Sequence, residues 1–308
     1  DEAEPGDMDD LMRHVVCLNR RSGEVVWQRE FAPELPESEY QGNGARHGYS
    51  SSTPTTDGEK LYVFFGKSGV VALSLDDGST IWRASVGTNT DGWGSSNSPV
   101  LYEKLLIVNA SIEDRALVAL DKQTGKRVWK AEGIRRAWTT PMLVETADKS
   151  TEVVVSMEGW ILGFDPRTGE ELWRAVGVDD YTCPSPTVHG DVVYVTAGRR
   201  VATIAVRAGG RGDVTDSHVL WRTTRAGAKV PSPVYHDGHL YLVHDGIGAA
   251  ICLNAETGDI VYRERFEPRS GTVWASPILA DGKLYVVYSI GKEECGLTIV
   301  PLESLQHP

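Results

Sequence analysis

A short motif that recurs along the chain limits its fold more than any other feature. Its clearest copy covers residues 118–129, where an apolar stretch leads into a polar turn closed by Gly125 and a second stretch ends at Trp129. Glycine readily adopts the positive φ that a tight hairpin needs, and Asp121 and Thr124 can hydrogen-bond the turn backbone. The motif therefore predicts a pair of antiparallel strands. Further copies end at five other aromatic residues: Trp27, Trp82, Trp173, Trp221 and Tyr262.

A second pattern alternates with the first. A proline that follows Ser or Thr precedes a turn and an apolar run, as at Thr53-Pro54 before Leu61-Tyr62-Val63 and at Ser276-Pro277 before Leu284-Tyr285-Val286. Together the two patterns give four short strands, A to D, in each repeat. The repeat length of about 40–50 residues is typical of propeller blades. We therefore expect an all-β fold, a β-propeller of four-stranded antiparallel blades.

The repeats differ in completeness. Residues 14–30 supply only strands C and D, and residues 274–302 supply A, B and C. If these two partial repeats share one blade there are about six blades, and if they are separate there are about seven. A third alternative is that the chain is part of a longer, eight-bladed ring. The complete repeats are expected at 51–86, 97–132, 138–176, 183–224 and 230–266.

The same patterns predict a simple domain organisation. Residues 1–13 carry six carboxylates and few apolar groups, so we expect a flexible acidic N-terminal segment. Residues 14–302 are expected to form a single propeller domain, and residues 303–308 a C-terminal tail. Within the propeller, the Gly-rich insertion 207–218 replaces the Thr-Gly turn of its repeat, and we expect its Arg211-Gly212-Asp213 to be a charged loop tip.

The aromatic residue at the end of each repeat is expected to have a structural role. Blades pack face to face, so a large side chain on the outermost strand can lie across the contact between two blades, against small residues such as Ala72 and Ala119. We therefore predict that Trp27, Trp129 and their counterparts are buried at successive contacts. The full set of predicted structural docking residues is Trp27, Trp82, Trp129, Trp173, Trp221 and Tyr262.

Composition excludes some classes of function. The net charge of −12 argues against a nucleic-acid partner, because phosphate binding needs a concentrated basic face. No run of about 18 apolar residues exists, so we expect no transmembrane segment. The four cysteines, at positions 17, 183, 252 and 295, form no C-x-x-C pair, so the sequence gives no support for zinc or dithiol chemistry. Cys17 and Cys252 are expected to be buried free thiols, and Cys183 and Cys295 to lie in or near connecting loops. The chain begins without a leader, so it is either cytosolic or exported with its leader removed.

The repeat also resembles a known family. The pattern Ala-Leu-Asp-x-x-Thr-Gly-x-x-x-Trp at 119–129 is similar to the docking motif of the pyrroloquinoline-quinone-type propeller repeat, and its recurrence extends this resemblance over residues 14–302. Two branches of that family differ in function. One contains quinoprotein alcohol dehydrogenases, and the other contains BamB-like scaffold propellers of the cell envelope. Both branches usually have eight blades.

The resemblance implies what an enzyme of this type would require. The dehydrogenases are about twice as long as this chain, hold the quinone beneath a disulfide between adjacent cysteines, and use a calcium ion and an aspartate base. No two cysteines here are adjacent, and no set of oxygen ligands stands out. We therefore expect no catalytic residue and no cofactor. Pyrroloquinoline quinone and calcium belong only to the alternative reading.

The longer connections of the repeat hold the candidate binding residues. In a four-stranded blade the D-to-A and B-to-C loops emerge on one face, and the D-to-A loops carry large side chains just before each proline. Aromatic residues and arginine are enriched in binding hot spots, although such residues can equally staple adjacent blades together. The candidate residues on this loop-rich face are Arg46, His47, Tyr49, Trp93, Arg135, Arg136, Trp138, Trp160, Asp180, Tyr181, Lys229 and Trp274.

These observations favour one function and leave an alternative. The favoured reading is a non-catalytic scaffold or binding propeller of the cell envelope, periplasmic or extracellular and monomeric, which binds a protein or glycan partner through the loop-rich face. The alternative is a quinone-dependent oxidoreductase, or a degenerate relative that retains the cofactor.

Overall fold

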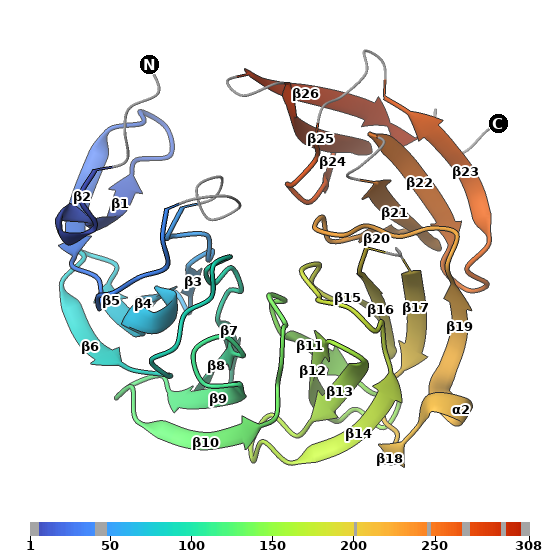
Figure 1. Ribbon diagram of the computed structural model, residues 1–308, viewed down its shortest axis with the longest axis horizontal. Helices are drawn as coiled ribbons and strands as arrows, with labels where there is room; N and C mark the ends of the chain where they lie inside the picture. Colours follow the sequence, from blue (N-terminus) through green and yellow to red (C-terminus); the bar gives the residue numbers. More distant parts are fainter. Residues whose placement is uncertain are drawn as a thin grey trace. The chain divides into compact units, whose positions relative to one another are not determined.

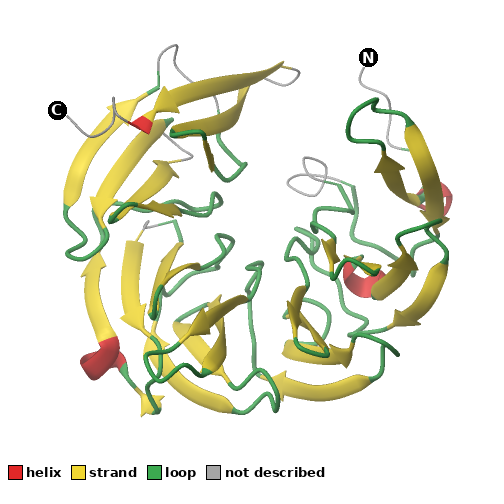
Figure 2. Ribbon diagram, turned by 180° about the vertical axis from the view of Figure 1, so that it is seen from behind, coloured by secondary structure: helices red, strands yellow, loops and turns green. Residues whose placement is uncertain are grey.

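The computed structural model describes residues 6–40, 48–199, 202–244, 248–266, 272–290 and 294–302. Almost all of its regular structure is antiparallel β-sheet, interrupted by a few short helical turns (Figure 2). Two compact units divide the chain, unit 1 covering Asp1–Arg135 and unit 2 covering Arg136–Pro308. No helix among the described residues is long and apolar enough to cross a membrane. Residues 1–5 and 303–308, which belong to the expected terminal segments, lie outside the described residues.

Unit 1 contains three sheets (Figure 1). The first is two-stranded, and the other two are four-stranded in the orders β3-β4-β5-β6 and β10-β9-β8-β7. Arg13, assigned to the flexible segment by sequence, is the first residue of β1. The elements are η1 (Met8–Asp10), β1 (Arg13–Leu18), β2 (Val25–Phe31), β3 (Thr55–Thr56), β4 (Lys60–Phe64), η2 (Gly66–Ser68), β5 (Val70–Ser74), β6 (Thr80–Ala84), β7 (Val100–Tyr102), β8 (Leu105–Ala110), β9 (Ala116–Asp121) and β10 (Arg127–Glu132).

Unit 2 contains four sheets, of five, four, four and three strands. Its strands fall within the repeats predicted from sequence. The first two sheets contain β11 (Met142–Glu145), β12 (Thr151–Met157), β13 (Trp160–Phe164), β14 (Glu171–Val176), β15 (Thr187–His189), β16 (Val192–Ala197), β17 (Ala202–Arg207), β18 (Gly212–Asp213), α2 (Thr215–His218) and β19 (Val219–Thr223). The last two contain β20 (Val234–His236), β21 (His239–His244), β22 (Ala249–Asn254), β23 (Ile260–Arg265), β24 (Ile278–Ala280), β25 (Lys283–Ile290) and β26 (Glu294–Pro301).

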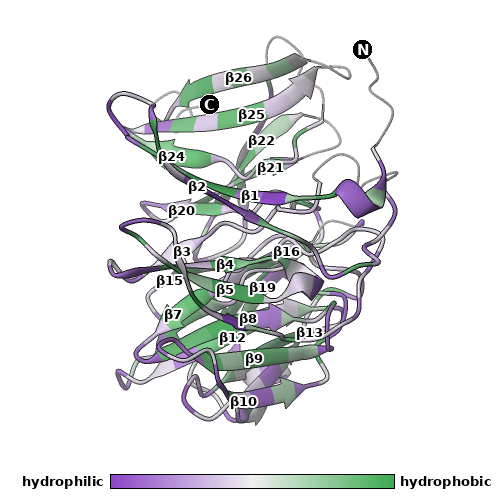
Figure 3. Cartoon of the chain, turned by 90° about the vertical axis from the view of Figure 1, so that its left-hand side faces the viewer, coloured by the Kyte–Doolittle hydropathy of each residue, from purple (hydrophilic) through white to green (hydrophobic). Residues whose placement is uncertain are grey.

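The core lies between neighbouring sheets. In unit 1, Tyr62 and Phe64 of β4 pack with Leu106 of β8 and Val118 of β9, and all four side chains are buried. The middle strands β8 and β9 are apolar over most of their length because both of their faces are covered, while the connections between strands carry most of the polar residues (Figure 3). Stacked, twisted four-stranded sheets with this connectivity are the blades of a β-propeller.

The docking aromatic packs on the glycine turn of the next sheet. In unit 1 the Trp82 ring covers Gly125, where an added Cβ would come within 2.6 Å of the ring, and Trp82 Nε1 donates to Lys122 O at 3.1 Å. The Trp27 ring covers Gly78 in the same way. In unit 2, Trp221 packs on Gly258, although this ring is only partly buried. Tyr262 is also partly buried, and Trp129 is buried.

Trp173 departs from this arrangement because the next repeat lacks the usual turn. Its ring lies against Gly163 of its own sheet, and its Nε1 donates to the buried carboxylate of Glu152 at 2.6 Å. The insertion that replaces the turn is not the charged loop tip expected from sequence. Gly212 and Asp213 form β18, which adds to β14 as a fifth, parallel strand.

Candidate binding site at the loop end

The D-to-A and B-to-C connections of unit 1 meet at one end, where β2, β6 and β10 finish and β1, β5 and β9 begin. We call this the loop end of unit 1. Its frame is a buried ion pair between Arg13 and Glu37, whose side chains are 3% and 6% exposed. Arg13 also donates through Nε to Tyr49 O at 3.1 Å and through Nη1 to Ser68 Oγ at 2.9 Å. Arg13 thereby joins β1 to the β2–β3 and β4–β5 connections, and leaving one member of a buried ion pair alone costs roughly 3–5 kcal/mol.

A second buried carboxylate, Glu113, lies in the β8–β9 loop. Its Oε1 accepts a hydrogen bond from Ser95 Oγ, whereas Oε2 is buried with no hydrogen-bond partner among the described residues. Burial raises the pKa of Glu113 to about 7. Its backbone oxygen accepts from Thr88 N and Asn89 N, both at 3.1 Å, so the residue fixes the loop that follows β6.

Next to this frame is an apolar pocket of about 300 Å³, which we call the Tyr40 pocket. The Tyr40 and Tyr49 rings lie 5.9 Å apart, and Tyr49 OH donates to Ser38 O at 2.6 Å. Tyr40 and Met12 are 46% and 41% exposed, so large apolar side chains face solvent on a fixed support. The pocket is lined by Gly6, Asp7, Met8, Asp10, Leu11, Met12, Tyr40 and Tyr49.

In unit 2, two of the aromatic residues predicted to bind a partner are buried against each other. Trp138 is 5% exposed and meets Tyr181, which is 6% exposed, edge to face with ring centres 6.4 Å apart. Trp138 N donates to Thr182 O at 2.8 Å, and Thr182 N donates to Arg136 O at 3.2 Å, so the two loops are also joined through their backbones. These two aromatics therefore staple consecutive loops together and offer little surface to a partner.

The other predicted residues are scattered between the units. In unit 1, Trp93 is half-buried and Arg135 is exposed. In unit 2, the half-buried Trp160 starts β13 beneath the guanidinium of Arg174, which is 5.3 Å from its ring centre. Four further unit 2 residues are exposed or half-buried: Arg136, Asp180, Lys229 and Trp274. Arg46 and His47 lie outside the described residues.

Sequence reasoning missed most of the loop end of unit 1. It included Tyr49 but not Tyr40, Met12 or the pair of Arg13 and Glu37. Met12 and Arg13 stand at the end of an acidic segment that suggested flexibility, and carboxylates such as Glu37 are common in loops, so neither carried a distinctive signal.

The described residues do not match the requirements of a quinone–calcium site. No group of three or more His, Cys, Asp or Glu side chains in the described ranges is placed to hold a metal ion. Glu113 has one free carboxylate oxygen, but its neighbouring cavity measures only about 20 Å³, and Arg13 and Lys67 are among the residues that line it. That space admits about one water molecule and not a quinone.

Comparison with known proteins is consistent with this description. The family model described as outer membrane protein assembly factor BamB matches residues 12–212 and 211–298. The chain belongs to the BamB family. BamB of Shewanella oneidensis is 24% identical over 90% of this chain and 78% of its own length. Tetrathionate hydrolase of Acidithiobacillus ferrooxidans is 23% identical over 95% of this chain, which spans only 56% of that protein.

Solved structures support the same fold. BamB from Moraxella catarrhalis superimposes with a TM-score of 0.67 and 18% identity, covering 89% of this chain and 75% of that one. The quinohemoprotein alcohol dehydrogenase ADHIIG of Pseudomonas putida HK5 gives a TM-score of 0.60 and 11% identity, covering 91% of this chain and 60% of that one. At these identities the likeness concerns the fold, which is a β-propeller shared by BamB and by the dehydrogenase.

Proposed function

We propose that this chain is a non-catalytic scaffold of the cell envelope and that the loop end of unit 1 binds a protein partner. The observation that carries the proposal is the Tyr40 pocket, in which exposed tyrosine and methionine side chains stand on a rigid, buried ionic frame. Tyrosine supplies a large contact area at a low cost in conformational entropy, and methionine adapts to the shape of its partner. Such a pocket suits an apolar anchor residue from another protein.

The family supports the same function. BamB is named as an outer membrane protein assembly factor, which implies work on or beside other proteins of the envelope. We therefore propose a location in the periplasm or at the cell exterior. The tetrathionate hydrolase and dehydrogenase relatives are enzymes, so an enzymatic function is the alternative to the scaffold function. No arrangement of side chains in the described part of the chain favours that alternative.

The proposal is tested by affinity purification from envelope extracts of the native host, with bound proteins quantified by mass spectrometry. We expect Tyr40→Ala to reduce recovery of a specific partner about thirtyfold, which corresponds to the roughly 2 kcal/mol of a hot-spot residue. Val128→Ala is the matched control, because Val128 is 52% exposed on the outer strand β10 of the same unit. Equal recovery with both variants would contradict a binding role for the loop end of unit 1.

A further inference from the structure

The chain contains its own example of a bound extended segment. Gly212 and Asp213 of β18 lie parallel to the outer edge of β14, opposite Trp173 and Arg174. Besides the strand pairing itself, hydrogen bonds run from Val214 N to Arg174 O at 2.8 Å and from Val176 N to the side-chain Oγ1 of Thr215 at 3.0 Å. The outer edge of a D strand in this protein can therefore accept an added strand.

The added segment also satisfies side chains of β14. Val214 is buried, and Leu172, which immediately precedes Trp173, packs against the core cluster that contains Val214. Asp213 lies opposite Arg174 in the strand register, whereas the hydrogen-bonded partner of the Arg174 guanidinium is Glu171 of the same strand, at 2.6 and 2.8 Å. The segment thus places an acidic residue opposite the arginine of the strand edge and an apolar residue beyond it.

The strand β6 carries the same pattern without an added segment. Its Ile81-Trp82-Arg83 aligns with Leu172-Trp173-Arg174, because Trp82 pairs with Ala72 as Trp173 pairs with Gly163. Ile81 is 45% exposed, in contrast to the partly buried Leu172. β6 ends its sheet, and no described strand pairs with its outer edge. By the β14 register, Arg83 O and Ser85 N face that edge.

Arg83 differs from the cations at the equivalent position of the other sheets. Lys130 pairs with Asp114 at 2.8 Å. Arg222 Nη1 donates to Gly177 O at 3.0 Å, and Arg263 donates to Arg225 O. Arg83 makes no hydrogen bond or ion pair with the described residues and rests only on the Phe31 ring, 5.1 Å from its centre.

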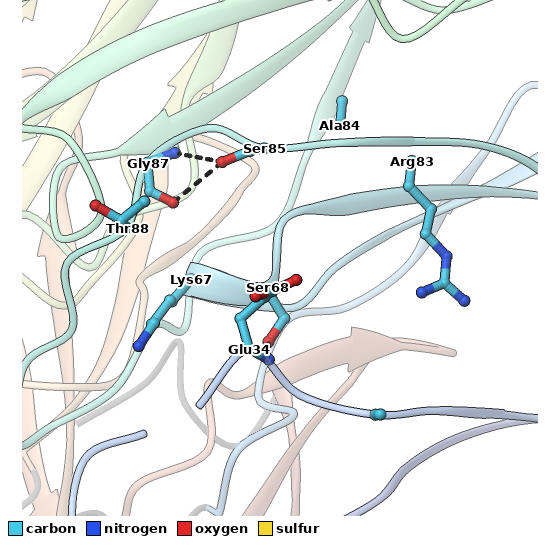
Figure 4. Close-up of a pocket in the computed structure, with 9 residues that line it drawn as sticks. Glu34, Lys67, Ser68, Arg83, Ala84, Ser85, Gly87 and Thr88 are labelled. Atoms are coloured by element: carbon cyan, nitrogen blue, oxygen red, sulfur yellow. Dashed lines mark hydrogen bonds between the residues drawn. The ribbon is translucent and has the colours of Figure 1, made fainter. Parts of the chain in front are cut away.

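A polar pocket of about 370 Å³ adjoins Arg83 (Figure 4). Lys67 lies on another wall, where Nζ has a single acceptor, Pro36 O at 2.6 Å. Glu34 is the one carboxylate of the lining, so the pocket carries a net positive charge in a chain whose net charge is −12. The lining residues are Ala32, Glu34, Lys67, Ser68, Arg83, Ala84, Ser85, Gly87 and Thr88.

We propose that the outer edge of β6 binds an extended segment of a partner protein that places an acidic residue beside Arg83 and an apolar residue beyond it. The partner backbone pairs with Arg83 O, and a hydroxyl at the place of Thr215 accepts from Ser85 N, as in the addition of β18 to β14. Its carboxylate pairs with Arg83, and Lys67 attracts further acidic residues of the same segment. This inference rests on the proposed binding function but uses a different surface from the Tyr40 pocket.

The probe is the chain's own segment 209–216 as a free, capped peptide, titrated into isotope-labelled protein and followed by nuclear magnetic resonance. We expect saturable shifts at the amides of residues 81–85. Arg83→Gln should weaken binding about tenfold, the order expected for one lost charge-assisted hydrogen bond. A peptide with Asp213→Asn should bind the parent protein about tenfold more weakly than the unchanged peptide does. The two peptides should bind the Arg83→Gln variant equally well. Lys104→Gln is the matched control, an exposed lysine on the β7–β8 turn.

The proposal is overturned if millimolar peptide leaves the 81–85 amides unchanged, or if Lys104→Gln weakens binding as much as Arg83→Gln. Arg83→Gln should melt close to the parent protein, because Arg83 makes no hydrogen bond or ion pair with the described residues and the variant loses only the contact with the Phe31 ring. The two proposals can also fail separately when Tyr40→Ala and Arg83→Gln are compared in the affinity purification.

If only Tyr40→Ala loses the envelope partner, the scaffold function is supported and the β6 site is not. If neither variant loses the partner, both binding surfaces are contradicted.

Discussion

At the scale of single residues, Glu113 is a buried carboxyl group whose charge state should affect the stability of the fold. The residue is 1% exposed, and burial raises its pKa from 4.5 to about 7. The folded protein therefore holds a proton that the unfolded chain releases between about pH 4.5 and pH 7. The contribution of this group to the free energy of unfolding is greatest at low pH, falls through that window, and is lost above about pH 7.

We expect Glu113→Gln to remove this dependence, because glutamine does not titrate. Between pH 5 and pH 8 the parent protein should lose roughly 2–3 kcal/mol relative to the variant, which is most of the amount that corresponds to the raised pKa. Urea unfolding of both proteins at each pH gives the difference, and all other titrating groups cancel in it. Parallel curves for the two proteins would show that Glu113 is ionised in the folded state throughout.

Individual residues were the least predictable part of the molecule. The sequence placed Trp138 and Tyr181 on the correct loops, but it could not tell that their edge-to-face contact buries both rings. Whether a loop aromatic is exposed depends on the neighbouring loop, which lies more than 40 positions away in the chain. For the same reason the sequence does not show that Arg83 has no hydrogen-bonded or ionic partner among the described residues.

At the scale of elements, the glycine turn and the aromatic ring of the preceding sheet act as one unit. Gly125 and Gly23 occupy the same place in two copies of the motif, with φ of 70° and 75°. An added Cβ would strike the Trp82 ring at Gly125 but would meet nothing within 4 Å at Gly23. The pair therefore separates the cost of the backbone conformation from the cost of a blocked docking site.

Gly23→Ala should destabilise the protein by about 1–2 kcal/mol, the cost of a left-handed conformation. Gly125→Ala should cost about 1–3 kcal/mol more, because it overfills the contact with Trp82. In a Trp82→Ala background that difference should disappear. Denaturant unfolding of the single and double variants measures this difference in the free energy of unfolding. An equal cost at both glycines in the parent protein would show that the Trp82 ring moves aside without a cost in free energy.

The elements themselves were largely predictable. Each copy of the motif combines turn-forming residues with apolar stretches on either side. The strands β3–β6 and β20–β23 therefore fall inside the ranges 51–86 and 230–266 predicted from sequence. The structural role of the Ser or Thr that precedes each proline was not predicted from sequence. Thr53 N donates to Ser98 Oγ at 2.9 Å and Ser185 N donates to Ser232 Oγ at 3.0 Å, so this hydroxyl links one sheet to the next. Only the stacked arrangement reveals such a link.

At the scale of the whole molecule, regular sheets support a few irregular connections, and those connections hold the features that can recognise a partner. The Tyr40 pocket, the ion pair of Arg13 and Glu37, and the Arg83 pocket all belong to unit 1. In unit 2, two of the predicted binding aromatics, Trp138 and Tyr181, pack against each other. We therefore propose that a partner protein would bind unit 1 before unit 2.

The most direct test of this assignment is site-specific photo-crosslinking in intact cells of the native host. A photoreactive amino acid replaces either Tyr40, in the pocket, or Gln123, in the exposed β9–β10 turn at the opposite end of unit 1. The scaffold account predicts a discrete crosslinked protein from position 40 and none from position 123. A crosslink from position 123 alone, or from neither position, would contradict it.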